Sequence, residues 1–503
     1  MSAPRQHTVV IIGAGPTGIT VATLLAQYGI ATLVLDRWDG VYPQPRAVHL
    51  DDEVYRIVER LGIGSKFAAI SRPALGLRLL DPQMKVLAEF HRDPAQSRNG
   101  YPQANMFDQP EFEALLRANL RNYPLVTLRG NAEVNEIRNK GGRTLITFTD
   151  RVDGTEHTVE ADYLLGCDGA NSLVRRRIGS AMRDLNFEQR WLVVDVASTV
   201  DLYQWAGVHQ VCDPRRAGTF MQIGDVRYRW EFRLLPGETA ADFPTIAALR
   251  PLIAPWTSRA DDSQLELIRV TEYTFRAQIA NHWRRGSTFL LGDAAHLTPP
   301  FVGQGMGAGL RDAMNLSWKL AGVLNGTLES SVLDTYEQER KPHARRLINL
   351  ALTVGRAMTA GGRVGDLLRR TAVPKMHLLP GMRSKVLDSQ TPALPGSALI
   401  HKTRAPRQLA GTLCPNVLTN GNRLDSVLGD GFTVITTAPL TPRQQTAIAE
   451  RGAATYIAES GSELATWLAR GHAEAAIIRP DRTVMRAGRD VAEVCRSLSA
   501  AVR

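Results

Sequence analysis

The sequence contains no hydrophobic run that approaches the roughly 18 residues of a membrane-spanning helix. It begins MSAPRQH and enters the strand-like segment TVVIIG without the regions of a secretory signal. Glycine (42 residues) and proline (27 residues) are too few for a low-complexity or collagen-like chain of 503 residues. These absences predict a globular, cytoplasmic protein, and the length predicts two or three domains.

Cysteine is also scarce, and no two of the cysteines form a C-x-x-C pair: they are Cys167, Cys212, Cys414 and Cys495. This excludes a disulfide scaffold, and it argues against a dithiol redox enzyme and a structural zinc site. We therefore expect no metal site.

The positive charge is not concentrated in one segment. Lys and Arg exceed Asp and Glu by 10, but they are spread along the chain and no RNA- or DNA-binding motif accompanies them. A basic balance also suits an anionic ligand. We expect solvated surfaces and contacts with an anionic cofactor, and no nucleic-acid partner.

The first motif is G-x-G-x-x-G, formed by Gly13, Gly15 and Gly18. It follows a strand-like run and opens a helical one, and Asp36 ends the next strand-like run. The glycines would let the backbone approach a pyrophosphate, which the helix N-terminus favours, and Asp36 would accept hydrogen bonds from ribose hydroxyls. The motif predicts ADP binding but leaves NAD and FAD open.

The second motif separates these two cofactors. Gly292-Asp293 ends a buried strand, and the glycine-rich run from Gly303 to Gly309 follows Pro299-Pro300. A carboxylate at a strand end can hold a ribityl hydroxyl, and the glycines let a flat ring lie against the backbone. A third segment, Cys167-Asp168-Gly169, likewise ends a strand and precedes a helix. Together they favour FAD.

The remaining patterns predict the organisation of the chain. Alternating apolar and polar residues at about 190–275 predict a mainly antiparallel sheet, and residues 52–61, 111–121, 310–323 and 333–350 predict helices. A stretch rich in Pro, Arg and Gly at about 371–410 predicts a linker, and strand-like and helical runs beyond it predict a smaller α/β unit. No repeat of fixed period is present.

The three motifs, in this order and spacing, resemble those of the single-component flavin-dependent aromatic hydroxylases, the family of 4-hydroxybenzoate and phenol hydroxylases. Within that family the sequence is most similar to the 3-(3-hydroxyphenyl)propionate hydroxylases. The likeness extends to Pro45-Arg46-Ala47, Asp51-Asp52-Glu53 and Leu333-Asp334-Thr335-Tyr336, and it covers residues 7–350 strongly. The C-terminal unit is similar to the thioredoxin-like appendage of phenol hydroxylase relatives, with Ile478-Arg479-Pro480-Asp481 as its most recognisable segment.

The resemblance implies an α/β fold: a Rossmann-like FAD-binding domain with an inserted antiparallel-sheet substrate domain and a C-terminal thioredoxin-like domain. The implied boundaries are 1–75, 100–185 and 275–370 for the FAD-binding domain, 76–99 and 186–274 for the substrate domain, 371–410 for the linker and 411–503 for the C-terminal domain. Because the C-terminal unit lacks C-x-x-C, we expect it to serve packing or a homodimer.

The resemblance also implies a set of cofactor contacts. Besides the glycines of the first motif, Asp36 and Asp168, the residues expected to hold non-covalent FAD are Arg46, Gln109, Asp293, Pro300, Gly305, Met306 and Gly307. The Ser and Arg that hold the substrate carboxylate in 4-hydroxybenzoate hydroxylase fall on Met221 and Ile223 here. We therefore expect a phenylpropionate-type acid in preference to 4-hydroxybenzoate.

The implied reaction begins with hydride transfer from NADH or NADPH to FAD, and the absence of a second dinucleotide motif predicts that this nucleotide binds transiently. O₂ then forms a flavin C4a-hydroperoxide, which hydroxylates a phenol ortho to its hydroxyl. His49 is the first candidate for the base, because histidine titrates near neutral pH. On the strand expected to roof the substrate we favour Arg229 over Arg227 for an anionic group, and we include Trp230; His296 is expected to be structural.

Other readings of the motifs remain. A tailoring hydroxylase of a polyketide or antibiotic would share the same fold and motifs. A flavin halogenase would show a W-x-W pair, and a disulfide reductase or two-site monooxygenase would need C-x-x-C or a second nucleotide motif; the sequence has none of these. A non-enzymatic flavin-binding regulator is the alternative from another class.

Overall fold

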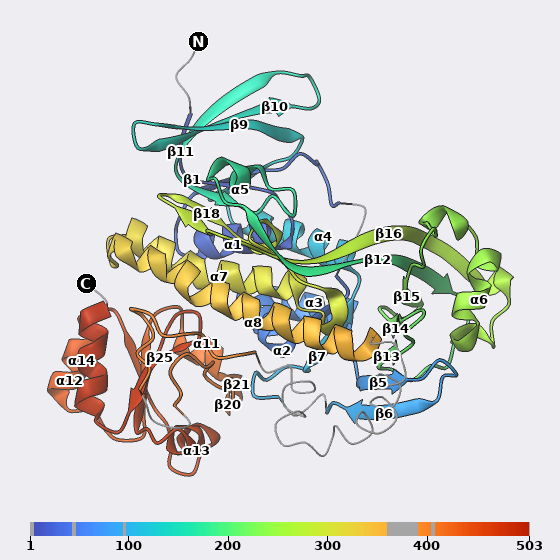
Figure 1. The fold of residues 1–503 in the computed structure, drawn as a ribbon. Coiled ribbons are helices and arrows are strands. Elements are labelled where there is room, and N and C mark those ends of the chain that lie inside the picture. The colour runs from blue at the N-terminus through green and yellow to red at the C-terminus, as the bar shows by residue number, and fades with distance from the viewer. Residues whose placement is uncertain (1–4, 43–46, 94–96, 360–390, 404–407, 502–503) are drawn as a thin grey trace.

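The computed structural model describes residues 5–42, 47–93, 97–359, 391–403 and 408–501. Three main β-sheets organise these residues, and two long helices cross the middle of the molecule (Figure 1). We call the three parts the parallel-sheet domain, the antiparallel-sheet domain and the C-terminal unit. No helix among the described residues is both long and apolar enough to cross a membrane.

The parallel-sheet domain is built on five parallel strands in the order β18-β11-β1-β2-β8. Their bounds are β1 (Arg5–Ile12), β2 (Thr32–Leu35), β8 (Val126–Arg129), β11 (Glu156–Gly166) and β18 (Thr288–Leu290). The short β17 (Arg284–Arg285) borders β18, and β9 (Ala132–Lys140) and β10 (Arg143–Asp150) extend β11 as an antiparallel ribbon. The apolar runs of β1 and β2 are buried because helices cover a parallel sheet.

Helices pack around this sheet. Helix α1 (Pro16–Gln27) packs against α7 (Gly305–Leu324), and α8 (Asp334–Thr359) packs beside α7. Helix α7 begins five residues before the predicted start, because the glycine-rich run is itself the first turn of the helix. A small sheet, β3-β7-β4, and four shorter helices complete the domain: β3 (His49–Asp51), β4 (Ser71–Pro73), β7 (Ala104–Phe107), α2 (Asp52–Arg60), α3 (Gly64–Ile70), α4 (Gln109–Asn119) and α5 (Leu173–Arg177).

The antiparallel-sheet domain has the strand order β19-β16-β12-β15-β14-β13-β5-β6. Its long strands β12 (Met182–Ser198) and β16 (Leu265–Ala280) run out from the parallel-sheet domain, as Figure 1 shows. The others are β5 (Gly76–Leu80), β6 (Val86–His91), β13 (Val208–Val211), β14 (Gly218–Gln222), β15 (Arg227–Arg233) and β19 (His296–Leu297), and α6 (Ile246–Thr257) covers one face. The antiparallel sheet predicted for about 190–275 is confirmed, and among its described strands β13 and β5 form the one parallel pair.

The C-terminal unit is a separate four-stranded sheet in the order β23-β22-β24-β25. Strands β22 and β23 are parallel, and β24 and β25 form an antiparallel hairpin beside them. The elements are β20 (Leu418–Thr419), β21 (Asn422–Arg423), β22 (Thr433–Thr436), β23 (Ala454–Ile457), β24 (Ala475–Ile478), β25 (Val484–Gly488), α11 (Leu424–Leu428), α12 (Pro442–Ala449), α13 (Glu463–Arg470) and α14 (Val491–Ala501). Of the expected linker, residues 371–390 and 404–407 lie outside the described residues.

Candidate active site

The G-x-G-x-x-G loop joins β1 to α1, and its glycines meet different surroundings. Gly13 has φ +103°, and a Cβ there would lie 2.3 Å from the carbonyl oxygen of Cys167. A Cβ on Gly18 would lie 1.9 Å from the carbonyl oxygen of Gly13, so both positions require glycine. A Cβ on Gly15 would meet nothing within 4 Å. The open space beside Gly15, at the start of a helix that has no side-chain cap, has room for a phosphate.

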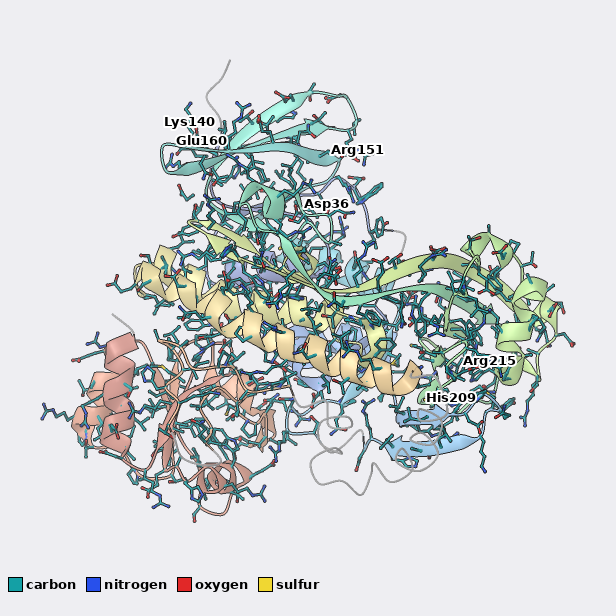
Figure 2. The ribbon with its side chains drawn as sticks, viewed as in Figure 1. Asp36, Lys140, Arg151, Glu160, His209 and Arg215 are labelled. Atoms are coloured by element: carbon teal, nitrogen blue, oxygen red, sulfur yellow. The ribbon has the colours of Figure 1, made fainter. Side chains whose placement is uncertain are left out.

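Asp36 meets this loop, as the spacing predicted. One carboxylate oxygen accepts a hydrogen bond from the Ala14 N–H at 2.5 Å, and the other accepts from the Trp38 N–H at 2.7 Å. Figure 2 shows Asp36 in the parallel-sheet domain, far from His209 in the antiparallel sheet. The N-terminus of α1, the open space beside Gly15 and the Asp36 carboxylate together fit the ADP half of a dinucleotide.

The Gly-Asp segment lies directly against the N-terminus of α1. Gly292 has φ +60°, and its Cβ would lie 2.8 Å from the Thr17 hydroxyl; a Cβ on Gly309 of α7 would lie 2.2 Å from the same atom. The Gly292 N–H donates to Asp312 at 3.1 Å. Asp293 occupies the adjoining single turn, Gly292–Ala294. The first motif, the Gly-Asp segment and α7 are thus brought together at one edge of the sheet.

A buried ion cluster holds the Gly-Asp segment in place. Asp312 contacts the His296 ring at 2.7 Å and the Arg340 guanidinium at 2.9 Å. Burial alone would raise the pKa of Asp312, but these two partners hold that pKa below its ordinary value. All three side chains are buried. Sequence reasoning did not predict these roles of Asp312 and Arg340, because no local pattern separates a buried charge from an exposed one on a helix.

The proline-glycine turn connects this segment to α7. Pro300 begins a single turn that ends at Gly303, with φ +61°. Helix α7 then starts at Gly305; Met306 is partly buried and Gly307 is buried against α2. The four residues predicted to line a flavin ring therefore lie in one short segment, Pro300 in the single turn and the other three in the first turn of α7.

Three buried side chains clamp this turn from behind. The side-chain amide nitrogen of Gln304 donates to Asp51 at 2.8 Å. The Arg311 guanidinium donates to the side-chain oxygen of Gln304 at 2.9 Å and to Asp51 at 2.5 Å. Asp51 also caps α2 by accepting from the Val54 N–H at 2.9 Å. Gln304 and Arg311 were not predicted from the sequence, and Arg311 could have been suspected only as a charge within a buried helix.

His49, on β3, lies against the same turn. Its Nδ1 is 3.5 Å from the Gly303 carbonyl oxygen, and a Cβ on Gly303 would lie 2.7 Å from that nitrogen. Burial, with the Arg92 charge, lowers the pKa of His49 to about 4. The ring is therefore neutral at pH 7 and does not titrate there, which removes the reason for choosing it as the base.

Arg229 already has a charged partner. Register places Met221, Arg229, Asp195 and Arg269 in one row across β14, β15, β12 and β16. Arg229 is fully buried and binds Asp195 through two contacts, of 2.6 and 2.9 Å; Arg269 donates to Asp195 at 2.6 Å. The expectation that Arg229 meets an anionic substrate group does not fit this pairing. Arg227 likewise forms an ion pair, with Asp108.

Trp230 points the other way. Because side chains alternate along a strand, it shares the face of Tyr228 and Phe232, and it packs 5.2 Å from the Phe220 ring in the core under α6. The opposite face meets the parallel-sheet domain, since Met221 packs with Met106 of β7. The prediction that Trp230 serves the site therefore does not fit the register.

The other expected cofactor residues have local roles. Gln109 accepts from the Ala47 N–H at 2.6 Å and donates to Glu113 at 2.5 Å. Asp168 accepts from Ser172 at 2.5 Å and from the Val174 N–H at 3.0 Å, so it caps the start of α5. Arg46 lies outside the described residues.

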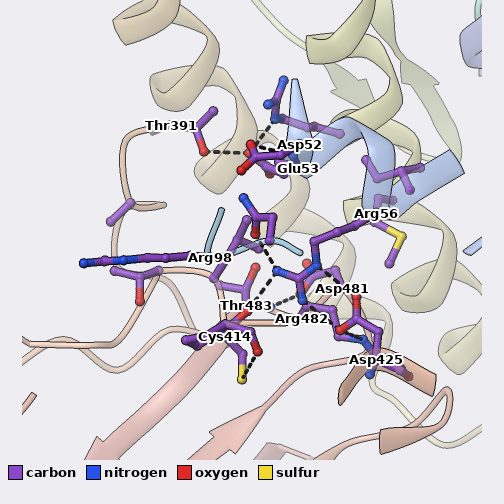
Figure 3. Close-up of a pocket in the computed structure, with 18 of the residues that line it drawn as sticks. Asp52, Glu53, Arg56, Arg98, Thr391, Cys414, Asp425, Asp481, Arg482 and Thr483 are labelled. Atoms are coloured by element: carbon purple, nitrogen blue, oxygen red, sulfur yellow. Dashed lines mark hydrogen bonds and ion pairs between the residues drawn. The ribbon is translucent and has the colours of Figure 1, made fainter. Parts of the chain in front are cut away.

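A cavity of 1240 Å³ lies elsewhere, between α2, α7 and α8 and the C-terminal unit. Figure 3 shows Arg56 reaching from α2 to Asp425, which it contacts at 2.7 and 2.9 Å. Asp52 also lines this cavity; burial and the neighbouring Asp51 raise its pKa to about 7. Two ion pairs, Arg56–Asp425 and Arg60–Asp430, join α2 to the C-terminal unit at this cavity.

Comparison with known proteins identifies the family. Residues 6–351 match the family model described as FAD binding domain. A 3-(3-hydroxy-phenyl)propionate/3-hydroxycinnamic acid hydroxylase of Mycolicibacterium gilvum (strain PYR-GCK) is 35% identical over 447 residues, covering 86% of this chain and 76% of that protein. A probable NADH-specific resorcinol 4-hydroxylase of Rhodococcus jostii (strain RHA1) is 32% identical over 512 residues, covering 97% of this chain and 93% of that protein.

Solved structures show the same fold over the whole chain. The flavin-dependent monooxygenase PieE, in complex with FAD and substrate, superposes with a TM-score of 0.81 at 21% identity and 99% coverage of both chains. The rebeccamycin biosynthetic enzyme RebC with reduced flavin gives a TM-score of 0.80 at 20% identity, over 99% of this chain and 100% of that chain. Together with the matched motifs, these findings show that the chain belongs to the family of FAD-binding aromatic hydroxylases and is a flavin-dependent monooxygenase.

Proposed function

We propose that this monooxygenase uses NADH or NADPH and O₂ to hydroxylate a phenol ortho to its hydroxyl group. The observation that carries the proposal is the position of the Pro300–Gly307 turn. It continues from the Gly-Asp segment beside α1, and it contacts both His49 and the antiparallel sheet, where Phe301 lies 5.9 Å from the Trp191 ring. A ring held by this turn would thus face a substrate bound between the two domains.

The chain's own residues would bind, orient and enclose the reactants. Bound FAD supplies hydride acceptance and oxygen activation. The α1 N-terminus and Asp36 would hold its ADP part, and Asp293 its ribityl chain; Arg46, Gln109 and Asp168 stay predictions for the same cofactor. The Asp51–Gln304–Arg311 clamp would keep the turn rigid, because each of these side chains is buried and hydrogen-bonded to the other two. The Trp191–Phe301 contact would help to exclude water.

Two classes of phenol are candidates for the substrate. The expected phenylpropionate-type acid is supported by the relative from Mycolicibacterium gilvum, which is named for such acids. An uncharged diphenol is supported by the Rhodococcus jostii relative, which matches nearly the whole chain and is named for resorcinol. The cluster that contains Met221 and Ile223 is apolar. Membership of a hydroxylase family leaves the regulator alternative without support.

The C-terminal unit has a parallel pair and an adjoining antiparallel hairpin, with helices around them. We infer from this arrangement a thioredoxin-like domain that serves docking rather than redox chemistry. Its contact with α7 and α8 runs through Arg479 and Glu339, 2.9 Å apart. The expected homodimer stays a prediction.

A turnover assay tests the proposed function. Purified protein should carry one FAD per chain, and phenols should accelerate both NADH oxidation and O₂ uptake, with a catechol-type product identified by mass spectrometry and NMR. Methyl ethers of the same phenols are the matched control and should not be hydroxylated. Equal turnover of phenol and ether would contradict ring activation by the free hydroxyl, and absence of any hydroxylated product across a phenol panel would refute the proposal. Parallel assays with NADPH identify the preferred nucleotide.

A further inference from the structure

Glu231 is a buried residue on the face of the antiparallel sheet that meets the parallel-sheet domain. It lies on β15, two residues after Arg229 and on the same face, between Thr219 of β14 and Val193 of β12. Only 7% of the residue is exposed. None of the expected roles includes it, because glutamate in an alternating strand ordinarily points to solvent.

The position of Glu231 follows from the contacts on either side of it. Towards one end of its face, Met221 packs against Met106 of the parallel-sheet domain. Towards the other end, Trp191 contacts Phe301 of the proline-glycine turn at 5.9 Å. Glu231 therefore lies between two points at which the antiparallel sheet meets the domain that holds the cofactor.

The carboxyl group of Glu231 has no hydrogen-bond partner among the described residues, although its polar neighbours do. Thr219 donates to Gln210 at 2.8 Å, and Asp195 is fully occupied by Arg229 and Arg269. Burial raises the pKa of Glu231. The charges of Arg229 and Arg269 oppose that rise. The Glu231 oxygens are not among the fully buried, unpartnered side-chain atoms of the described residues, so this carboxyl group is open to a small ligand.

We propose that Glu231 accepts a hydrogen bond from a hydroxyl of the substrate other than the one that directs hydroxylation, and thereby selects an uncharged diphenol over a phenolic acid. The proposal rests on the proposed function and decides between its two substrate classes. Arg229 and Arg269 share Asp195, and Arg227 is paired with Asp108. Asp195 and Glu231 together balance the charges of Arg229 and Arg269, so a substrate carboxylate would add an unbalanced negative charge here, whereas a hydroxyl supplies a hydrogen-bond donor to Glu231.

The test compares three substrates in FAD-loaded enzyme: resorcinol, phenol and 3-(3-hydroxyphenyl)propionate. In the native enzyme, kcat/KM should be highest for resorcinol. Glu231→Leu should lower kcat/KM for resorcinol by roughly 10–100-fold, the usual effect of losing a hydrogen bond to a charged group, and should change that for phenol by less than about threefold. Glu231→Gln should raise kcat/KM for the acid, because it removes the like charge. Glu266 is an exposed glutamate on β16, and Glu266→Gln is the matched control. It should change neither the resorcinol-to-phenol ratio nor the acid-to-phenol ratio of kcat/KM.

The outcomes separate this inference from the proposed function. If no phenol is hydroxylated, the proposed function fails. If phenol is hydroxylated but the resorcinol-to-phenol ratio is the same in Glu231→Leu as in the native enzyme, or the native enzyme prefers the acid, the role of Glu231 is overturned while the function stands. Should Glu231→Leu fail to bind FAD, the acid-to-phenol ratio in Glu231→Gln decides: an unchanged ratio overturns the proposal.

Discussion

Removal of the Arg479 guanidinium is expected to undock the C-terminal unit. Arg479 is fully buried and binds both oxygens of Glu339 on α8, at 2.9 and 3.0 Å, as well as Asp481. Lys319 of α7 also contacts Glu339, at 2.8 Å. These two cations and two carboxylates balance, so Arg479→Met leaves one uncompensated negative charge in the interior. Breaking a buried pair in this way typically costs about 3–5 kcal/mol.

The loss can be measured by calorimetry of the FAD-loaded protein. A cost of that size should lower the first unfolding transition by roughly 6–20 °C, at about 2–4 °C per kcal/mol for domains of this size. Limited proteolysis should then release the C-terminal unit. Arg489→Met removes an exposed arginine from the same unit and should have no effect. Arg479→Met combined with Asp481→Asn restores the charge balance and should recover part of the loss. A single variant with native transition temperature and protease resistance would refute the reasoning.

Three further predictions follow from the site. Gly15→Val should abolish FAD binding, measured by flavin absorbance, and should leave the circular dichroism spectrum native, because the new side chain enters open space. Gly18→Ala should also destabilise the fold, because its Cβ clashes with the loop backbone. Retention of FAD by Gly15→Val would contradict the assignment. Burial and a neighbouring carboxylate raise the pKa of Asp52 to about 7, so the folded state keeps a proton that the unfolded state releases above about pH 4. Stability should therefore fall by up to about 4 kcal/mol as pH rises from 4 to 7, and Asp52→Asn, compared by thermal unfolding at pH 5 and 8, should lose this slope. His49→Ala should lower the yield of hydroxylated product per NADH oxidised without changing FAD content or the pH profile between 6 and 8, since its pKa of about 4 lies outside that range; a shifted profile would contradict this.

The sequence alone determined the cofactor motifs, because their geometry is local. A strand, a tight glycine turn and a helix follow one another within Val9–Gly18, and the short connection to the next strand places Asp36 beside the turn. The antiparallel pattern of residues 190–275 was equally readable, since apolar and polar residues alternate along its segments. The backbone angles of a glycine turn and the apolar–polar period of a strand both depend on residues that are neighbours in the sequence.

Tertiary structure decided which side chains serve the site. Both faces of β15 are buried, so alternation shows that Arg229 and Trp230 point in opposite directions but not which of them faces the parallel-sheet domain. Asp195, the partner of Arg229, lies 34 positions away, and Asp51, the partner of Gln304, lies 253 positions away. Charge pairing and the dielectric surroundings of a buried group depend on these distant contacts, which no local pattern encodes.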